Sequence, residues 1–144
     1  MKKLNELKKN KKGFTLMEMI VVIVIIGILM AILVPGIVKW IGKAKDVQIE
    51  ADARTAYLAV QGEVYSEFKT KDAAAAVGAV NNDTKLGEIL KEAGVDGKAT
   101  VLGASDYDAE TAHITKFTYT TKDGKKQAVY ENNTWEVSKP ESKG

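Results

Sequence analysis

The hydrophobic residues of this 144-residue chain change their spacing along the sequence. Residues 19–38 read MIVVIVIIGILMAILVPGIV, an apolar segment of twenty residues without a charge. At about 1.5 Å per residue, a helix of this length spans the roughly 30 Å hydrocarbon core of a bilayer. A core helix of a soluble domain is the alternative, but the rest of the chain is too polar to cover it on every face. The apolar segment therefore predicts a transmembrane helix.

After Lys39 the apolar residues recur at helical spacing, with charged and amide side chains between them. This pattern predicts one helix from Phe14 to about Ser66, membrane-embedded in its first half and amphipathic in its second. The second half carries an apolar stripe that needs a covering layer. The stripe consists of Ile49, Ala53, Ala56, Val60, Val64 and Phe68.

The pattern between residues 69 and 112 is less regular. Asp83 as N-cap and Gly94 as a stop signal predict a short helix over residues 84–93. The alanine-rich residues 71–78 fit either a short helix or a mobile connection. A strand is expected to start at Val101-Leu102.

From His113 onward the spacing of apolar residues becomes two, which is typical of strands with one buried face. Asp123-Gly124 and Asn132-Asn133 are expected to form tight turns between strands. The expected buried face carries Phe117, Tyr119, Ala128, Tyr130, Trp135 and Val137. The fold class is therefore α+β, with the long N-terminal helix packed on a small C-terminal antiparallel β-sheet of about three strands. The polar tail from Pro140 is expected to fray.

Charge is unevenly distributed. Residues 1–13 contain six lysines and one glutamate, whereas the remaining 131 residues have a net charge of −3. A nucleic-acid-binding domain carries clustered positive charge on its folded body, so a nucleic-acid partner is not expected. By the positive-inside rule, the N-terminus is expected in the cytoplasm and everything after Lys39 outside it.

The composition also limits the chemistry of the chain. There is no cysteine and a single histidine, which excludes disulfides and thiolate sites and nearly excludes a Ser-His pair or a multi-histidine metal site. No catalytic, metal-binding or cofactor-binding residue is expected. Three groups of residues could in principle bind a ligand, but each has a simpler structural interpretation. His113 is expected to be a strand-edge residue. Asp106 and Asp108 are expected to lie in a solvated loop rather than a Ca²⁺ site, and Lys122, Lys125 and Lys126 at a solvated hairpin tip rather than in a nucleic-acid contact.

Residues 11–18 read KKGFTLME and lead directly into the apolar segment. This combination of a basic leader, a Gly-Phe junction, an acid four residues after the Phe and a long apolar run resembles the class III prepilin signal of type IV pilins. With its Cys-free body, the chain is most similar to the Gram-positive, clostridial-like major pilins. The resemblance covers residues 1 to about 40 and extends to the rest only through the overall architecture.

The resemblance implies roles for five residues. Prepilin peptidase would cleave between Gly13 and Phe14, and the new N-terminal Phe14 would be N-methylated. The Glu18 carboxylate would meet the Phe14 amine of an adjacent subunit, although an intrachain pair with Phe14 and a solvated position at the headgroup level are alternatives. Gly27 and Pro35 would mark a stretch that unwinds in the filament, the alternative being an ordinary kink in a membrane helix.

These implications define three expected regions: a cleaved leader at residues 1–13, a transmembrane and filament-core helix at residues 14–38, and a globular head at residues 39–144. The expected protein is a non-enzymatic structural subunit of an extracellular type IV pilus, first a single-pass membrane prepilin and then part of a surface filament for adhesion, biofilm formation or twitching motility. Its expected partners are further copies of itself, prepilin peptidase, an inner-membrane assembly platform and minor pilins. The alternatives are a pseudopilin of a type II secretion or DNA-uptake machine and a membrane-anchored extracellular binding module.

Overall fold

The computed structural model describes residues 13–140 and confirms the α+β fold class. Its longest element is helix α2, Leu16–Phe68, close to the predicted helix from Phe14 to about Ser66. The chain divides between Gly42 and Lys43 into two units, an N-terminal unit and a C-terminal unit that is called the head below. Residues 1–12 and 141–144 lie outside the described residues, and so do the predictions for the leader, apart from Gly13, and for the polar tail beyond Pro140.

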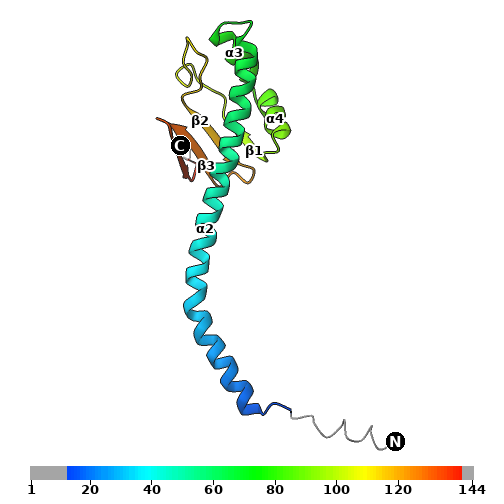
Figure 1. Ribbon diagram of the computed structural model, residues 1–144, viewed down its shortest axis with the longest axis vertical. Coiled ribbons are helices and arrows are strands. Elements are labelled where there is room, and N and C mark those ends of the chain that lie inside the picture. Colours follow the sequence, from blue (N-terminus) through cyan, green and yellow to red (C-terminus); the bar gives the residue numbers. More distant parts are fainter. Residues whose placement is uncertain (1–12, 141–144) are drawn as a thin grey trace, which may run out of the picture. The chain divides into compact units, whose positions relative to one another are not determined.

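In the N-terminal unit, every side chain from Gly13 to Ile41 is exposed. Figure 1 shows this part of α2 in blue to cyan. By length and composition α2 is able to cross a membrane, and none of its most apolar window is buried. Within the N-terminal unit, the described residues therefore provide no cover for the apolar segment.

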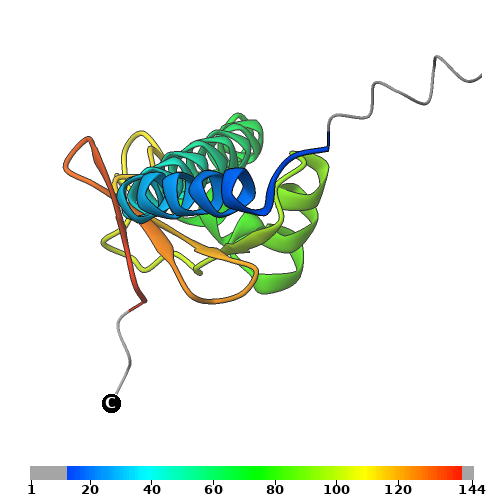
Figure 2. The ribbon, with the colours of Figure 1, turned by 90° about the horizontal axis from the view of Figure 1, so that it is seen from below.

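In the head, the second half of α2 buries one side. Ala53, Ala56, Val60 and Val64 are fully buried, and Ile49 and Phe68 pack half-buried against the same core. Figures 1 and 2 show this half of α2 lying across one face of the sheet. The predicted apolar stripe and its covering layer are thus confirmed.

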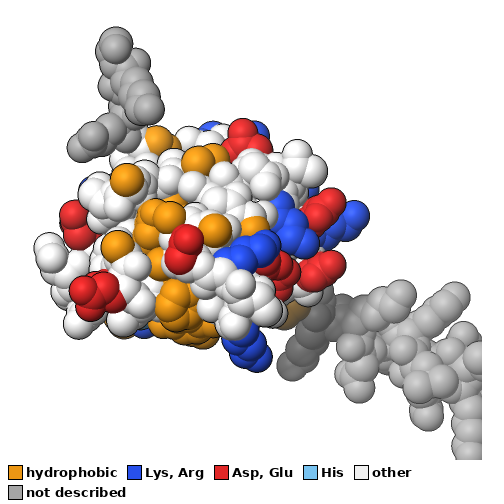
Figure 3. Space-filling view, turned by 90° about the horizontal axis from the view of Figure 1, so that it is seen from above, with side chains coloured by type: hydrophobic (Ala, Val, Ile, Leu, Met, Phe, Trp, Pro, Cys, Tyr) orange, Lys and Arg blue, Asp and Glu red, His pale blue; other side chains and the backbone are white. Residues whose placement is uncertain are grey.

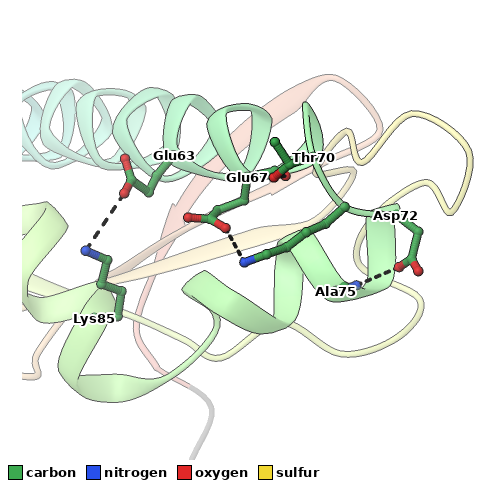
Figure 4. Close-up of polar contacts among 7 residues, drawn as sticks. Glu63, Glu67, Thr70, Asp72, Ala75 and Lys85 are labelled. Atoms are coloured by element: carbon green, nitrogen blue, oxygen red, sulfur yellow. Dashed lines mark hydrogen bonds and ion pairs between the residues drawn. The ribbon is translucent and has the colours of Figure 1, made fainter.

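Two short helices complete the helical layer. Helix α3, Ala73–Val80, begins at the N-cap Asp72, whose carboxylate accepts a hydrogen bond from the Ala75 N–H at 2.8 Å (Figure 4). Of the alanine-rich residues 71–78, residues 73–78 therefore belong to a helix, and Asp72 caps it. Helix α4, Asp83–Glu92, has Asn82 and not Asp83 as its N-cap, because the Asn82 side chain accepts from the Lys85 N–H. Its Lys85 also faces Glu63 of α2 across 3.8 Å (Figure 4).

The sheet is an antiparallel meander in the order β1-β2-β3-β4. Its strands are β1 (Gly97–Ala99), β2 (Phe117–Thr121), β3 (Gln127–Glu131) and β4 (Thr134–Ser138). In this register Phe117 lies opposite Tyr130, and Tyr130 lies opposite Trp135, so the expected apolar residues share one face. The prediction of about three strands missed β1, which pairs with β2 through only three residues.

The prediction of a strand that starts at Val101-Leu102 is wrong, because these residues lie outside every strand. Leu102 is buried, but its backbone is held by a side chain: the Asn81 amide donates to the Leu102 carbonyl at 2.7 Å and its oxygen accepts from the Leu102 N–H at 2.6 Å. This amide clamp satisfies the backbone groups that a neighbouring strand would otherwise satisfy. Residues 100–116 therefore form a long connection between β1 and β2.

The two expected turns are present with different lengths. Asn132 and Asn133 join β3 to β4 with positive φ angles of 52° and 60°, the geometry of a type I′ hairpin turn. Asp123-Gly124 lies in a five-residue connection between β2 and β3 and not in a two-residue turn. Gly124 has a φ of 67°, which glycine adopts without steric penalty.

Candidate functional site

The N-terminal end of α2 is closed by a reciprocal pair of hydrogen bonds. The Thr15 hydroxyl accepts from the Glu18 N–H at 3.1 Å, and a Glu18 carboxylate oxygen accepts from the Thr15 N–H at 3.0 Å. This arrangement is a capping box, in which two side chains satisfy backbone donors that the first helical turn leaves unpaired. The signal T-x-x-E is readable in the sequence at residues 15–18, but the interpretation of Glu18 as a charge partner overlooked it.

The junction expected for cleavage lies just before this cap. Gly13 and Phe14 precede α2 and are exposed, with 80% of the Phe14 surface accessible. A carboxylate has two oxygens with about four acceptor positions, so the bond to Thr15 uses only part of the capacity of Glu18. Glu18 is therefore able to cap its own helix and accept a further cationic donor.

Gly27 and Pro35 both lie inside α2, which is helical on either side of them. Pro35 has no N–H to donate to the preceding turn, and glycine is the weakest interior helix former after proline. Both residues are exposed, and a Cβ added to Gly27 would meet nothing within 4 Å among the described residues. Their expected role in unwinding therefore stays a prediction for the assembled state.

The candidate ligand residues of the head are used for local structure. One Asp108 carboxylate oxygen accepts from the backbone N–H groups of Glu110 and Thr111 and from the Thr111 hydroxyl, which lowers the pKa of Asp108. The Asp106 carboxylate accepts from the Gly103 N–H at 2.7 Å. Among residues 13–140 there is no group of three or more His, Asp or Glu side chains placed to hold a metal ion.

His113 lies in the connection before β2 and not on a strand edge as expected. Its Nδ1 is 3.1 Å from the Tyr65 hydroxyl, and its ring meets the edge of Tyr57 at 6.5 Å between centroids. These contacts tie the connection to α2. No second histidine exists in the chain with which it could form a metal site.

The neighbouring residues contain a buried contact that the sequence patterns did not reveal. The Gln61 amide donates to the Ala112 carbonyl at 3.1 Å and accepts from the Ile114 N–H at 2.6 Å. Gln61 is the only buried polar side chain of the core among the described residues, and Ala112 has a positive φ of 55°. A long-range pairing between a helix side chain and a loop backbone has no periodic signal in the sequence.

The lysines of the β2–β3 connection are partly paired. Lys122 bonds Asp96 at 2.9 Å, and Lys126 pairs with Asp46 of α2. The hydrogen bond to Asp96 raises the pKa of Lys122, which keeps this lysine charged. The expected position of these lysines at an exposed hairpin tip is confirmed.

An aromatic cluster connects α2 to the sheet. Tyr57 contacts Tyr130 at 4.9 Å and Trp135 at 6.1 Å between ring centroids, and its hydroxyl donates to the Ile114 carbonyl. Burial, followed by the neighbouring Tyr130, raises the pKa of Tyr57 to about 12. The cluster is structural, since it holds the half-buried edge of the sheet against α2.

Comparison with known proteins identifies one part of the chain. Residues 8–34 match the family model of the prokaryotic N-terminal methylation motif. No curated protein and no solved structure has a significant match to the chain. The matched segment contains Gly13, Phe14, Glu18 and Gly27, and ends one residue before Pro35.

The chain therefore carries the methylation motif that is the class III signal of type IV pilins. Together with the exposed apolar helix, the motif supports a pilin-like or pseudopilin protein that is anchored in the membrane as a prepilin. Such motifs belong to structural proteins that are generally not enzymes.

Proposed function

We propose that this protein is the structural subunit of an extracellular type IV pilus, cleaved between Gly13 and Phe14 and N-methylated on Phe14. The observation that carries the proposal is the methylation motif at the start of a helix whose first half is apolar and exposed. Lipid covers such a segment before assembly, and neighbouring helices cover it in a filament. The head has its own buried core and is suited for display outside the cell.

The processing step follows from the position of the junction. Gly13 and Phe14 lie outside the helix, so a peptidase reaches the bond between them without unwinding α2. Prepilin peptidase removes the lysine-rich leader on the cytoplasmic side, and the apolar helix stays with the mature chain. An inner-membrane assembly platform and minor pilins then take part in assembly.

Glu18 has two roles in this proposal. It caps α2 through Thr15 within its own chain, and its remaining acceptor positions bind the Phe14 ammonium of an adjacent subunit. A carboxylate within a membrane helix is unfavourable by about 2 to 3 kcal/mol at the centre of the helix and by less near its end. Pairing with an incoming amine removes this penalty and sets the register between subunits.

Gly27 and Pro35 provide the adaptable part of the helix core. Within the assembled filament the stretch between them unwinds, which permits close packing of neighbouring helices. The weak helix-forming tendency of glycine and the missing N–H of proline lower the free energy required for this change.

Two substitutions separate the two roles of Glu18. Glu18→Gln keeps an acceptor for the Thr15 N–H, since Glu and Gln both serve in capping boxes, but removes the negative charge. Thr15→Ala removes the cap and keeps the charge. If the proposal holds, electron microscopy of sheared surface material shows filaments for the parent chain and for Thr15→Ala, and none for Glu18→Gln, although all three proteins are cleaved and inserted.

Other results would contradict parts of the proposal. Filaments at the parent level for Glu18→Gln would show that capping, and not charge pairing, is the function of Glu18. A parent protein that is cleaved but found only within the cell envelope would indicate a pseudopilin. A protein that keeps its leader and stays in the membrane would indicate an anchored binding module.

A further inference from the structure

The lysines of the head gather at the end from which the chain leaves the apolar segment. Lys43 and Lys45 lie five and seven residues after the apolar segment ends at Val38 in α2, and Lys122, Lys125 and Lys126 come from the β2–β3 connection. Four of these lysines, Lys45, Lys122, Lys125 and Lys126, line one surface concavity with Ile49, Thr121 and Asp123, and Lys43 lies two residues before Lys45 in α2. These five lysines are called the lysine collar below.

The collar is held in place by contacts within the head. Lys126 pairs with Asp46, which fixes the β2–β3 connection beside the first turn of α2 in the head. Asp123 accepts from the Thr121 hydroxyl and from the Lys125 N–H, so the connection has a defined conformation. The side chain of Lys122 is 75% exposed even though it contacts Asp96. The amines thus face solvent from a structured surface.

Charge in the head is polarised. The collar and its three nearby acids, Asp46, Asp96 and Asp123, have a net charge of +2. The other charged residues between 43 and 140 are 8 basic and 13 acidic, a net of −5. Figure 3 shows the surface at the α3 end, where acidic and basic side chains are mixed. Positive charge therefore prevails at one end only.

The position of the collar along the chain coincides with the expected edge of the bilayer. Trp40, which is 75% exposed, follows the apolar segment, and tryptophan is enriched at the interface between membrane and water. Lys45 lies five positions after Trp40 in the helix, which corresponds to a rise of about 8 Å along the helix axis. This rise is comparable with the Debye length of about 8 to 10 Å, within which a charged surface acts on a lysine.

We propose that the lysine collar binds the anionic phospholipid headgroups of the leaflet from which the head emerges, and so seats the head on the membrane before assembly. The inference rests on the proposed membrane insertion. A second copy of the chain is the competing partner, because the acidic remainder of the head also attracts lysines. The lipid is favoured because Lys43 and Lys45 lie five and seven residues after Val38, the last residue of the apolar segment, and the pair of Lys126 with Asp46 places the β2–β3 connection beside them.

The test measures the reactivity of each lysine in the full chain, reconstituted in nanodiscs that expose both faces. One preparation contains phosphatidylcholine alone and the other is rich in phosphatidylglycerol. Amines are acylated briefly at about 0.1 M salt, where the Debye length is about 10 Å, and mass spectrometry gives a rate for every lysine. A surface potential of about −30 mV concentrates protons about threefold, so acylation of a lysine at the anionic surface slows by about that factor.

Internal controls are available on the same molecule. Lys69 and Lys71 lie just beyond the other end of α2, about 35 Å along the helix from Lys45, which is several Debye lengths. Their rates should be the same in both lipids. The rates of Lys122 and Lys125 should fall about threefold in phosphatidylglycerol, and the difference should disappear at 1 M salt, where the Debye length is about 3 Å.

Two other results would contradict the proposal that the lysine collar binds lipid headgroups. If Lys43 and Lys45 slow but Lys122 and Lys125 do not, the head does not rest on the lipid. If the lysines of the collar are protected equally in both lipids and increasingly with protein density, their partner is a second copy. Insertion is measured separately by extraction at alkaline pH, and a chain that fails to insert would contradict the proposed function as well.

Discussion

The two halves of α2 are continuous in sequence and opposite in their surroundings. From Leu16 to Ile41 every side chain is exposed although most are apolar, whereas from Lys43 to Phe68 one side is buried and most charged side chains lie on the other. The difference shows where each half finds its partner. The second half packs on the sheet of its own chain, and the first half requires lipid or other subunits.

The largest expected effect concerns the half with an internal partner. Phe117 is 1% exposed beneath α2, and Phe117→Ala should lower the free energy of unfolding of the head by about 3 to 5 kcal/mol through lost burial and a cavity. The matched control Phe14→Ala removes the same atoms from an exposed position and should leave this free energy unchanged within about 0.5 kcal/mol. Chemical denaturation of the reconstituted chain, followed by near-UV circular dichroism, measures both. Equal stability of the two variants would show that Phe117 is not part of a packed core.

The next prediction concerns the half without an internal partner. Ile28→Lys places a charge near the centre of the apolar segment and should disfavour membrane insertion by about 3 kcal/mol. Leu58→Lys makes the same kind of change at an exposed position of α2 in the head and should not affect insertion. Fractionation of membranes after alkaline extraction gives the inserted amount of each variant. Full insertion of Ile28→Lys would argue against a membrane-spanning segment.

A smaller effect is expected from the buried amide. Gln61→Leu leaves the Ala112 carbonyl and the Ile114 N–H without a partner inside the head, which should lower stability by about 2 kcal/mol. Gln48→Leu is the matched control on the same helix, because Gln48 is exposed and bonds only Asp52, and it should change stability by about 0.5 kcal/mol or less. Thermal melts compare the two. If Gln48→Leu lowers the stability of the head as much as Gln61→Leu does, the hydrogen bonds of Gln61 to Ala112 and Ile114 do not stabilise the head.

The smallest effect is a pH dependence of the head. The pKa of Tyr57 is about 12 in the folded head and about 10 in the unfolded chain, so the unfolded state loses its proton first as pH rises. The stability that the neutral phenol contributes is therefore fully present below pH 10 and is lost progressively toward pH 12. Burial also raises the pKa of Tyr119, which acts in the same direction.

Tyr57→Phe should accordingly make the decline in stability between pH 10 and pH 12 less steep without abolishing it. The slope is obtained from denaturation midpoints at several alkaline pH values, with Tyr107→Phe as the control, because Tyr107 lies outside the aromatic cluster and does not act on the pKa of Tyr57. An unchanged slope for Tyr57→Phe would mean that its phenol ionises equally in both states.

Periodicity explains which elements were predictable. The stripe from Ile49 to Phe68 and the alternation from Phe117 to Val137 each repeat a spacing that fixes one buried face, and both predictions are confirmed. Strand β1 has only three residues, too few for a repeat to be recognised, and its place depends on pairing with β2. The clamps of Asn81 and Gln61 connect residues 21 and more than 50 positions apart, so no local pattern encodes them.

The candidate site was predictable to a different extent. The motif around Gly13, Phe14 and Glu18 is short, contiguous and chemically specific, so the sequence alone identified it and the family model agrees. The Thr15–Glu18 cap was also encoded locally but was overlooked, because a charge next to an apolar run invites an explanation by charge alone. The lysine collar required the structure, since it joins residues about 80 positions apart.

Mass spectrometry of the protein sheared from the cell surface tests the central claim most directly. The account predicts a chain that begins at Phe14 and carries one additional methyl group on its α-amine, with no peptide from residues 1–13. A surface protein that still begins at Met1, or one cut elsewhere than between Gly13 and Phe14, would contradict it.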